Sequence, residues 1–152
     1  MTGKEAEDLF FKIASERGTP VLADKNQNMF EHWDVQVNGI TYDVKTEKKL
    51  NRSDSDTCDV VWLELTNVRG NEGWLRGKAE KIAFYQDEGF YIVDREKLLA
   101  FTLNLVNSDV FYFTKQHAKW YRRRNRKDII TYVFFKEISH LVEEIWNCQK
   151  KS

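Results

Sequence analysis

The sequence has few of the residues that build covalent or zinc-stabilised folds. Its 152 residues include two cysteines, three histidines and one proline. Cys58 and Cys148 lie far apart and fit no metal or redox motif, so we expect two reduced thiols rather than a disulfide framework. The scattered histidines and cysteines also lack the ligand spacing of a zinc site. A zinc module and a disulfide-rich secreted scaffold are both disfavoured.

Long hydrophobic runs are also missing. No apolar stretch approaches the ~20 residues that a membrane-spanning helix needs. The first residues, "MTGKEAEDLF", lack the hydrophobic region of a signal peptide. The sequence therefore predicts a cytoplasmic protein with no membrane partner.

A net charge is absent too, because 24 Lys and Arg balance 24 Asp and Glu. The two signs are nevertheless separated along the chain. Residues 1–100 hold 14 basic and 19 acidic side chains, whereas residues 101–152 hold 10 basic and 5 acidic ones. Such a separation predicts a polyanionic partner for the basic part and a cation for the acidic part.

Hydrophobic and aromatic residues are plentiful, at 41% and 14%, which is typical of a folded globule. The length favours one domain, residues 1–152. Hydrophobic periodicity predicts helices at 3–17, 95–107 and 136–150. It predicts strands at 19–23, 32–37, 40–48, 58–65, 81–86, 89–94, 109–113 and 128–135. The order of these elements predicts an α/β or α+β domain built on a mixed sheet.

The strongest local signal is Asn38-Gly39, which predicts a tight hairpin because both positions tolerate positive φ. Counting outward from this turn places Asp34 opposite Asp43 on one face of the sheet. Two carboxylates so close repel each other unless a positive charge lies between them. A divalent cation would explain the pair, because Mg²⁺ takes one or two carboxylates together with water and phosphate oxygens.

The second strand of this hairpin carries the stretch "DVKTEKK". In an extended chain Asp43 and Lys45 share one face, followed there by Glu47 and Lys49. One interpretation is a solvated face on which opposite charges neutralise each other. The other is a phosphodiester-cleaving site, in which Lys45 stabilises phosphate charge or positions the attacking water.

An acid on one strand and D-x-K on the next, after a helix bearing a glutamate, resembles the PD-(D/E)XK nuclease superfamily. The resemblance covers about residues 3–66, although no proline precedes Asp34. It implies a restriction-endonuclease-like sheet with an αβββαβ-type core. It also implies that Asp34 and Asp43 bind Mg²⁺, with Mn²⁺ as a substitute. Lys45 would assist the water, and Glu7 would support the metal site.

Glu64 lies in the apolar run "VVWLEL", which should form the central strand next to the hairpin. A charged side chain in such a run needs a partner. It would reach the metal site or form an ion pair with Lys45 or Lys49.

A strongly basic segment, residues 115–127, has seven Lys and Arg among its thirteen residues. The repulsion between these charges favours a polyanion over a plain solvated loop. Two aromatic residues in the segment would add faces on which bases stack. The predicted nucleic-acid contacts are Lys115, Lys119, Trp120, Tyr121, Arg122, Arg123, Arg124, Arg126 and Lys127.

Together these features predict a metal-dependent endonuclease that hydrolyses phosphodiester bonds, most simply in DNA. The resemblance extends to the compact nucleases of phages and mobile elements and to junction resolvases, which would act in the host cytoplasm. Two alternatives stay open: a catalytically inactive nucleic-acid-binding or assembly protein on the same fold, and a scaffold or inhibitor that binds an acidic protein. The apolar stripe of the predicted last helix, with Trp146, would pack on the protein's own sheet or form a homodimer.

Overall fold

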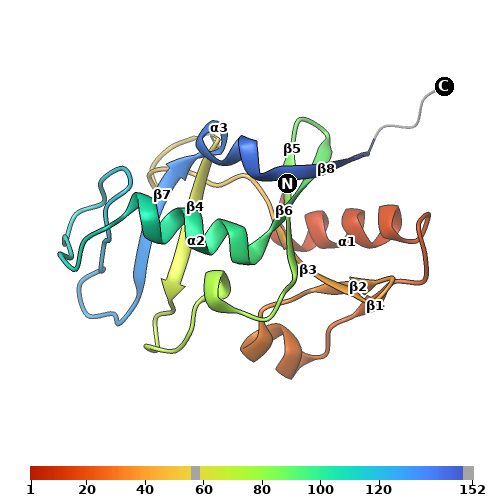
Figure 1. Cartoon of the computed structure of the whole chain (residues 1–152), viewed down its shortest axis with the longest axis horizontal. Coiled ribbons are helices and arrows are strands. Elements are labelled where there is room, and N and C mark those ends of the chain that lie inside the picture. The colour runs from red at the N-terminus through yellow and green to blue at the C-terminus, as the bar shows by residue number, and fades with distance from the viewer. Residues whose placement is uncertain (56–58, 149–152) are drawn as a thin grey trace.

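The computed structural model describes residues 1–55 and 59–148. Three α-helices occur in these residues: α1 (Gly3–Ala14), α2 (Arg95–Leu105) and the short α3 (Phe135–Ile138). The strands are β1 (Val21–Leu22), β2 (Val35–Val37), β3 (Ile40–Lys45), β4 (Val60–Thr66), β5 (Lys81–Gln86), β6 (Gly89–Asp94), β7 (Ile129–Phe134) and β8 (Val142–Asn147). Short turns of other helix types are η1 (Gln27–Glu31), η2 (Trp74–Arg76) and η3 (Ser139–Leu141). The fold is mixed α+β, as the sequence predicts (Figure 1).

Six of the strands form one mixed sheet in the order β1-β2-β3-β5-β6-β8. The pairs are antiparallel except for β3 and β5, which run parallel. The expectation that residues 58–65 form the strand beside the hairpin is wrong, because β5 occupies that place. An apolar run indicates a buried strand but carries no information about which strand lies next to it.

The first helix begins as predicted. The Thr2 side chain accepts a hydrogen bond from the Glu5 backbone, and Glu5 accepts one from the Thr2 backbone, which completes a capping box. Its apolar face packs on the six-stranded sheet, where Phe10 stacks on Trp146 with ring centroids 5.1 Å apart. Tyr42 of β3 joins the same aromatic cluster. This packing fixes the helix against the strand that carries Asp43.

Strands β4 and β7 pair with each other in a separate two-stranded sheet. Figure 1 shows this ribbon and α2 on one side of the molecule, and α1 with β1–β3 on the other. A second hydrophobic cluster, which includes Leu63, Leu75, Ile82, Leu98 and Val133, joins the two sheets. The two sheets therefore share a core, and a cleft between them belongs to the same folded unit.

The end of the chain differs from the prediction of one helix over 136–150. Over the described part of this range, up to residue 148, only α3 is α-helical, and the chain continues into β8 at the edge of the large sheet; residues 149 and 150 lie outside the described residues. Trp146 is 4% exposed and belongs to the core. The unpaired edge of β6 provides backbone hydrogen bonds that outweigh the helical periodicity of this segment. The predicted helical stripe does not form, so it supports no homodimer.

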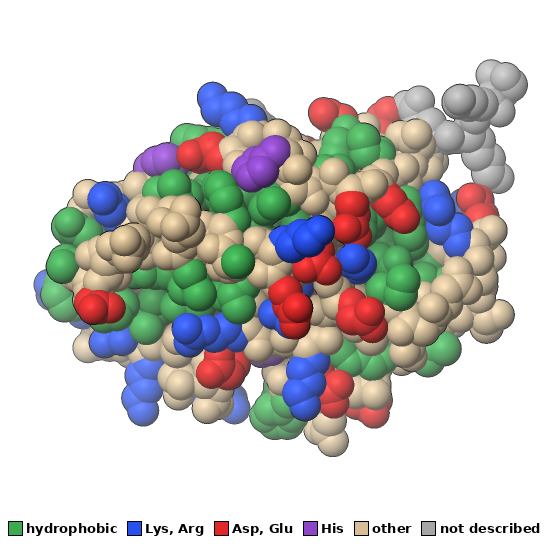
Figure 2. Space-filling model, in the orientation of Figure 1, with side chains coloured by type: hydrophobic (Ala, Val, Ile, Leu, Met, Phe, Trp, Pro, Cys, Tyr) green, Lys and Arg blue, Asp and Glu red, His purple; other side chains and the backbone are tan. Residues whose placement is uncertain are grey.

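Residues 109–113, predicted as a strand, lie in the long connection between α2 and β7. Tyr112 makes an isolated bridge to Tyr121, and no regular strand forms over 109–113. Val110, Phe111 and Phe113 are exposed there. Figure 2 shows hydrophobic side chains at this end of the molecule.

Two further expectations concern thiols and membranes. Cys148 forms no disulfide within the described residues, and Cys58 lies outside them. Across residues 1–55 and 59–148, every helix is too short or too polar to span a bilayer.

Candidate functional site

The Asn38-Gly39 turn sets the register of the β2–β3 hairpin as the sequence predicts. Asn38 and Gly39 have φ of 52° and 79°, and Val35 pairs with Tyr42. The hairpin extends one step further, because the Asp34 backbone N–H donates to the Tyr42 carbonyl at 2.8 Å. Asp34 and Asp43 therefore come together at the end of the hairpin.

The Asp34 carboxylate is held in place by two hydrogen bonds. Its Oδ2 accepts from the Val44 backbone N–H at 2.7 Å, and its Oδ1 accepts from Asn28 Nδ2 at 2.6 Å. Asn28 comes from the turn before β2 and carries no recognisable motif in the sequence, so sequence reasoning missed it. Both bonds orient Asp34 before any ligand arrives.

Asp43 is buried, with 5% of its surface exposed. Burial and the neighbouring charge of Asp34 raise the pKa of Asp43 to about 8, although Lys45 opposes this shift. Lys45 Nζ lies 3.3 Å from Asp43 Oδ2, without the angular geometry of a hydrogen bond. Asp43 Oδ2 is thus a buried oxygen with no hydrogen-bond partner among the described residues.

Glu7 reaches the same place from α1. Burial, followed by the charge and hydrogen bonding of Asp34, raises the pKa of Glu7 to about 7. Glu7, Asp34, Asp43 and Lys45 line one pocket of about 200 Å³, together with Asn28 and His32. Three carboxyl groups from three chain segments therefore adjoin one lysine. We call Glu7, Asp34 and Asp43 the acid cluster.

The acid cluster fits a divalent cation in one respect and not in another. Within the part of the chain that the structure describes, no three His, Cys, Asp or Glu side chains form a set able to hold a metal ion by themselves. Mg²⁺, however, commonly takes one or two carboxylates and completes its shell with water and phosphate oxygens. Asp43 Oδ2, which accepts no hydrogen bond among the described residues and lies beside Asp34, suits such a partial set of ligands.

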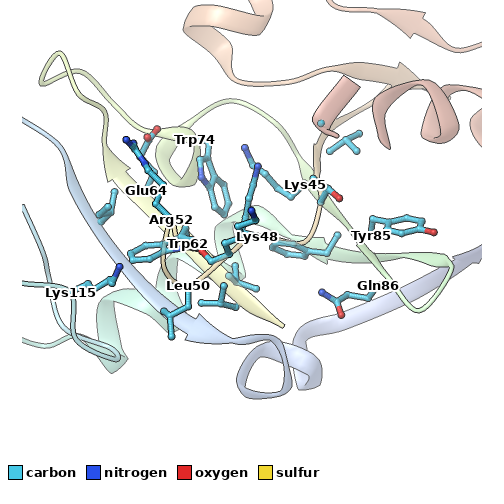
Figure 3. Close-up of a pocket in the computed structure, with 18 of the residues that line it drawn as sticks. Lys45, Lys48, Leu50, Arg52, Trp62, Glu64, Trp74, Tyr85, Gln86 and Lys115 are labelled. Atoms are coloured by element: carbon cyan, nitrogen blue, oxygen red, sulfur yellow. Dashed lines mark hydrogen bonds between the residues drawn. The ribbon is translucent and has the colours of Figure 1, made fainter. Parts of the chain in front are cut away.

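A larger cleft of about 980 Å³ adjoins this pocket, and Gly3, His32, Val44 and Lys45 line both. Figure 3 shows Lys45 and Lys48 projecting into it beside Trp74. Its basic lining residues are Lys45, Lys48, Lys49, Arg52, Lys115 and Arg123, and its aromatic ones are Trp62, Trp74, Phe84, Tyr85 and Tyr121. Among the described residues that line the cleft, Glu64 is the one acidic side chain.

The cleft brings two distant parts of the sequence together. Lys115, Tyr121 and Arg123 of the basic segment lie on the same cleft as Lys45. The sequence analysis assigned the basic segment and Lys45 to the same function, but nothing in the sequence predicts that they are adjacent. Their adjacency depends on the pairing of β4 with β7, which carries the basic segment to the hairpin side.

Not every basic side chain of this segment is free to contact a phosphate. Lys119, Arg124, Arg126 and Lys127 are exposed. Arg122 lies over the Phe111 ring at 5.0 Å, and Arg123 forms an ion pair with buried Asp128 at 2.6 Å. Two of the predicted phosphate-binding arginines therefore have contacts within the protein.

Trp120 is predicted from the sequence to stack on a base, and this is wrong. It is 4% exposed and packs in the hydrophobic core. Tyr121 remains half-buried on the cleft. Trp62 on β4, which the sequence analysis did not select, lines the cleft instead. Burial of the Trp120 indole contributes to the core, which local charge patterning cannot reveal.

The predicted alternation of charges beyond Lys45 does not continue, because β3 ends there. Glu47 and Lys49 follow in irregular chain, and Lys48 forms an isolated bridge to Val60. Burial, followed by the charge of Lys45, lowers the pKa of Lys48. Of the four predicted charged residues, only Asp43 and Lys45 therefore share a face of β3.

Lys45 is fixed between the acid cluster and the cleft. Its Nζ lies 4.7 Å from the centre of the Trp74 ring as well as 3.3 Å from Asp43. Glu64 lines the cleft but makes no ion pair with Lys45 or Lys49 within the described residues. Its predicted role as the partner of one of these lysines is therefore wrong.

The chain matches no protein-family model, no curated protein and no solved structure. The resemblance to the PD-(D/E)XK nucleases stays a hypothesis based on the residues themselves.

Proposed function

We propose that this protein is a metal-dependent nuclease that hydrolyses phosphodiester bonds, with DNA as its substrate. One observation carries the proposal: the acid cluster and Lys45 adjoin each other at the edge of a cleft that is lined, among the described residues, by six basic ones. A polyanion held in the cleft by these cations would bring a phosphate to Lys45 and the acids. A protein that only binds nucleic acid gains nothing from carboxylates beside phosphate, because they repel it.

The arrangement of the side chains suits hydrolysis at a phosphate. Lys45 Nζ, placed by Asp43 and Trp74, can donate to a phosphate oxygen and stabilise its growing negative charge. Asp34 is oriented by its two hydrogen bonds, and Glu7 lies behind it. Asp43 would give up a proton when a cation binds, because the cation favours its ionised form.

The cofactor that fits is Mg²⁺ or Mn²⁺ held by Asp34 and Asp43, with Glu7 in support. When present, a divalent ion supplies Lewis-acid charge stabilisation and makes water acidic enough to attack near neutral pH. The protein would bind the strand, orient the acids and hold Lys45 at the phosphate.

Incubation with plasmid, single-stranded and four-way-junction DNA in Mg²⁺, Mn²⁺ or EDTA tests the proposal. We expect cleavage with either ion and none in EDTA. Lys45→Met should lower the rate at least ~100-fold, which is typical of losing a charge-stabilising donor. Lys97→Met, an exposed lysine on α2, is the matched control and should cut normally.

Failure to cut any of these substrates with either ion would contradict the proposal. Binding without cutting would instead support the catalytically inactive binding protein on the same fold.

A further inference from the structure

The shape of the cleft suits an unpaired strand better than a duplex. The cleft is a concave space of about 980 Å³ whose walls come from β4, β5, the chain after β3 and the basic segment. This volume lies near the upper end of the about 300–1,000 Å³ typical of small-ligand sites. It accommodates a few nucleotides, whereas a duplex keeps its bases stacked inside the helix and out of reach of the walls.

The aromatic walls provide surfaces for bases. Trp62, Tyr85 and Tyr121 are half-buried, so part of each side chain is accessible in the cleft. Aromatic rings inside a basic groove stack on the π-faces of unpaired bases with little regard to sequence. Paired bases do not offer these faces, so such rings add affinity for single strands in particular.

Trp62 is held in position before any ligand binds. Its indole N–H donates to the Lys49 carbonyl at 3.2 Å, and its ring packs against Tyr132 with centroids 5.3 Å apart. A side chain that is already ordered loses little conformational freedom on binding. Trp62 is therefore the best stacking surface in the cleft.

The lysines and arginines around the aromatic walls would contact successive phosphates of the nucleic-acid backbone. Lys48, Lys49 and Arg52 lie on one chain segment, and Lys115 and Arg123 on another. Figure 3 shows Lys48 and Arg52 on one part of the cleft and Lys115 on another. Phosphates held by these groups would lead the strand toward Lys45 and the acid cluster.

We infer that the cleft binds single-stranded nucleic acid, with an unpaired base stacked on Trp62 and phosphates held by the surrounding lysines and arginines. The inference rests on the proposed nuclease function for the fate of the bound strand. The binding itself needs no divalent ion and is separable from cleavage.

The test measures fluorescence anisotropy in EDTA with labelled oligo(dT), oligo(U) and a blunt duplex of about 12 nucleotides, within the range that one binding module covers. We expect the single strands to bind at least ~10-fold more tightly than the duplex, since stacking is worth about this much per base. Comparison of oligo(dT) with oligo(U) then distinguishes DNA from RNA as the source of the strand.

Trp62→Ala should weaken single-strand binding about 10-fold and leave duplex binding unchanged, whereas Trp62→Phe should keep most of the affinity. Phe113→Ala is the matched control, because Phe113 is 72% exposed and does not line the cleft. If Trp62→Ala does not fold, quenching of tryptophan emission in the parent by oligo(dT) replaces it. Stacking predicts quenching by the single strand and not by the duplex.

Equal affinity for duplex and single strand, or unchanged single-strand affinity in folded Trp62→Ala, would overturn the inference. Cleavage by Mg²⁺-loaded protein without a single-strand preference would leave the nuclease proposal standing alone. Trp62-dependent strand binding with no cleavage would leave the binding inference standing and remove the nuclease.

Discussion

Two buried aspartates, Asp43 at the acid cluster and Asp128 beside the basic segment, have contrasting surroundings. Both are almost fully buried, at 5% and 0% exposed. Both also have one buried carboxylate oxygen without a hydrogen-bond partner among the described residues. Asp128 accepts two short contacts from Arg123, from Nε at 2.7 Å and Nη2 at 2.6 Å. Asp43 has Lys45 at 3.3 Å and two further carboxyl groups nearby.

The difference lies in how each negative charge is neutralised. The guanidinium of Arg123 neutralises the charge of Asp128, so this ion pair stabilises the fold. At the acid cluster three carboxyl groups adjoin one lysine, so carboxyl groups are in excess, and the raised pKa values of Glu7 and Asp43 mean that these two hold protons near neutral pH. Structural ion pairs do not need such an excess, and a site for a cation from solution does. The same residue type is thus structural in one region and a candidate ligand in the other.

The largest expected effect of a single substitution on stability should differ in sign between the two sites. In EDTA, Asp128→Asn should lower the free energy of unfolding by about 1–3 kcal/mol, because Arg123 loses its charged acceptor. Asp43→Asn should leave it unchanged near neutral pH, where a pKa of about 8 keeps Asp43 largely protonated. At higher pH the variant should be the more stable protein, because it avoids a buried charge and repulsion from Asp34. Urea unfolding measures both. Similar losses of unfolding free energy in the two variants would contradict the distinction between a structural Asp128 and a ligand-binding Asp43.

The second comparison is between arginines with contacts inside the protein and cations that form no ion pair within residues 1–55 and 59–148. Replacing exposed Arg124, Arg126 and Lys127 with Ala should flatten the log–log salt dependence of DNA binding by about 2–3 units, near 0.9 per phosphate contact. These residues are better targets than Arg122 and Arg123, whose loss would also disturb Phe111 and Asp128. An unchanged slope would show that the basic segment is not the contact surface.

The last comparison concerns the pH dependence of stability without metal. A folded-state pKa of about 8 for Asp43 means that the folded chain holds a proton that the unfolded chain releases near its ordinary value. The free energy of unfolding should therefore fall as pH rises from about 4 to about 8, with Asp43 contributing about 1.4 kcal/mol for each pH unit in this range. Glu7, with its pKa raised to about 7, contributes in the same direction.

Asp43→Asn should flatten the dependence of the free energy of unfolding on pH. Asp128→Asn should lower the free energy of unfolding at every pH and leave the contribution of Asp43 to the pH dependence unchanged. Unfolding curves at several pH values measure the difference. A parent protein that becomes more stable toward about pH 8 would contradict the raised pKa of Asp43.

Local chemistry explains which parts of the site the sequence could predict. The capping box at Thr2 and the Asn38-Gly39 turn act within a few residues of themselves. The meeting of Asp34 with Asp43 follows from counting along one hairpin, so it was predictable. Glu7 was expected at the site only from the resemblance, and α1 brings it to the same pocket as Asp34 and Asp43.

Contacts between distant segments account for what the sequence did not predict. The edge of β6 decides that residues 142–147 form a strand, although their apolar spacing also suits a helix. The pairing of β4 with β7 creates the cleft and selects Trp62 as a lining residue. Trp120 has an aromatic ring able to stack on a base, but it is buried in the core. In each case the deciding partner lies far away in the chain.

Binding of Mn²⁺ to the parent protein, Asp43→Asn and Asp128→Asn, measured by isothermal titration calorimetry without nucleic acid, tests the central claim most directly. The excess of carboxyl groups at the acid cluster predicts a Mn²⁺ site in the parent and in Asp128→Asn. It predicts loss of that site in Asp43→Asn, because a carboxylate ligand becomes a neutral amide. Equal Mn²⁺ binding by all three proteins, or none by the parent, would contradict the assignment of the acid cluster as a metal site.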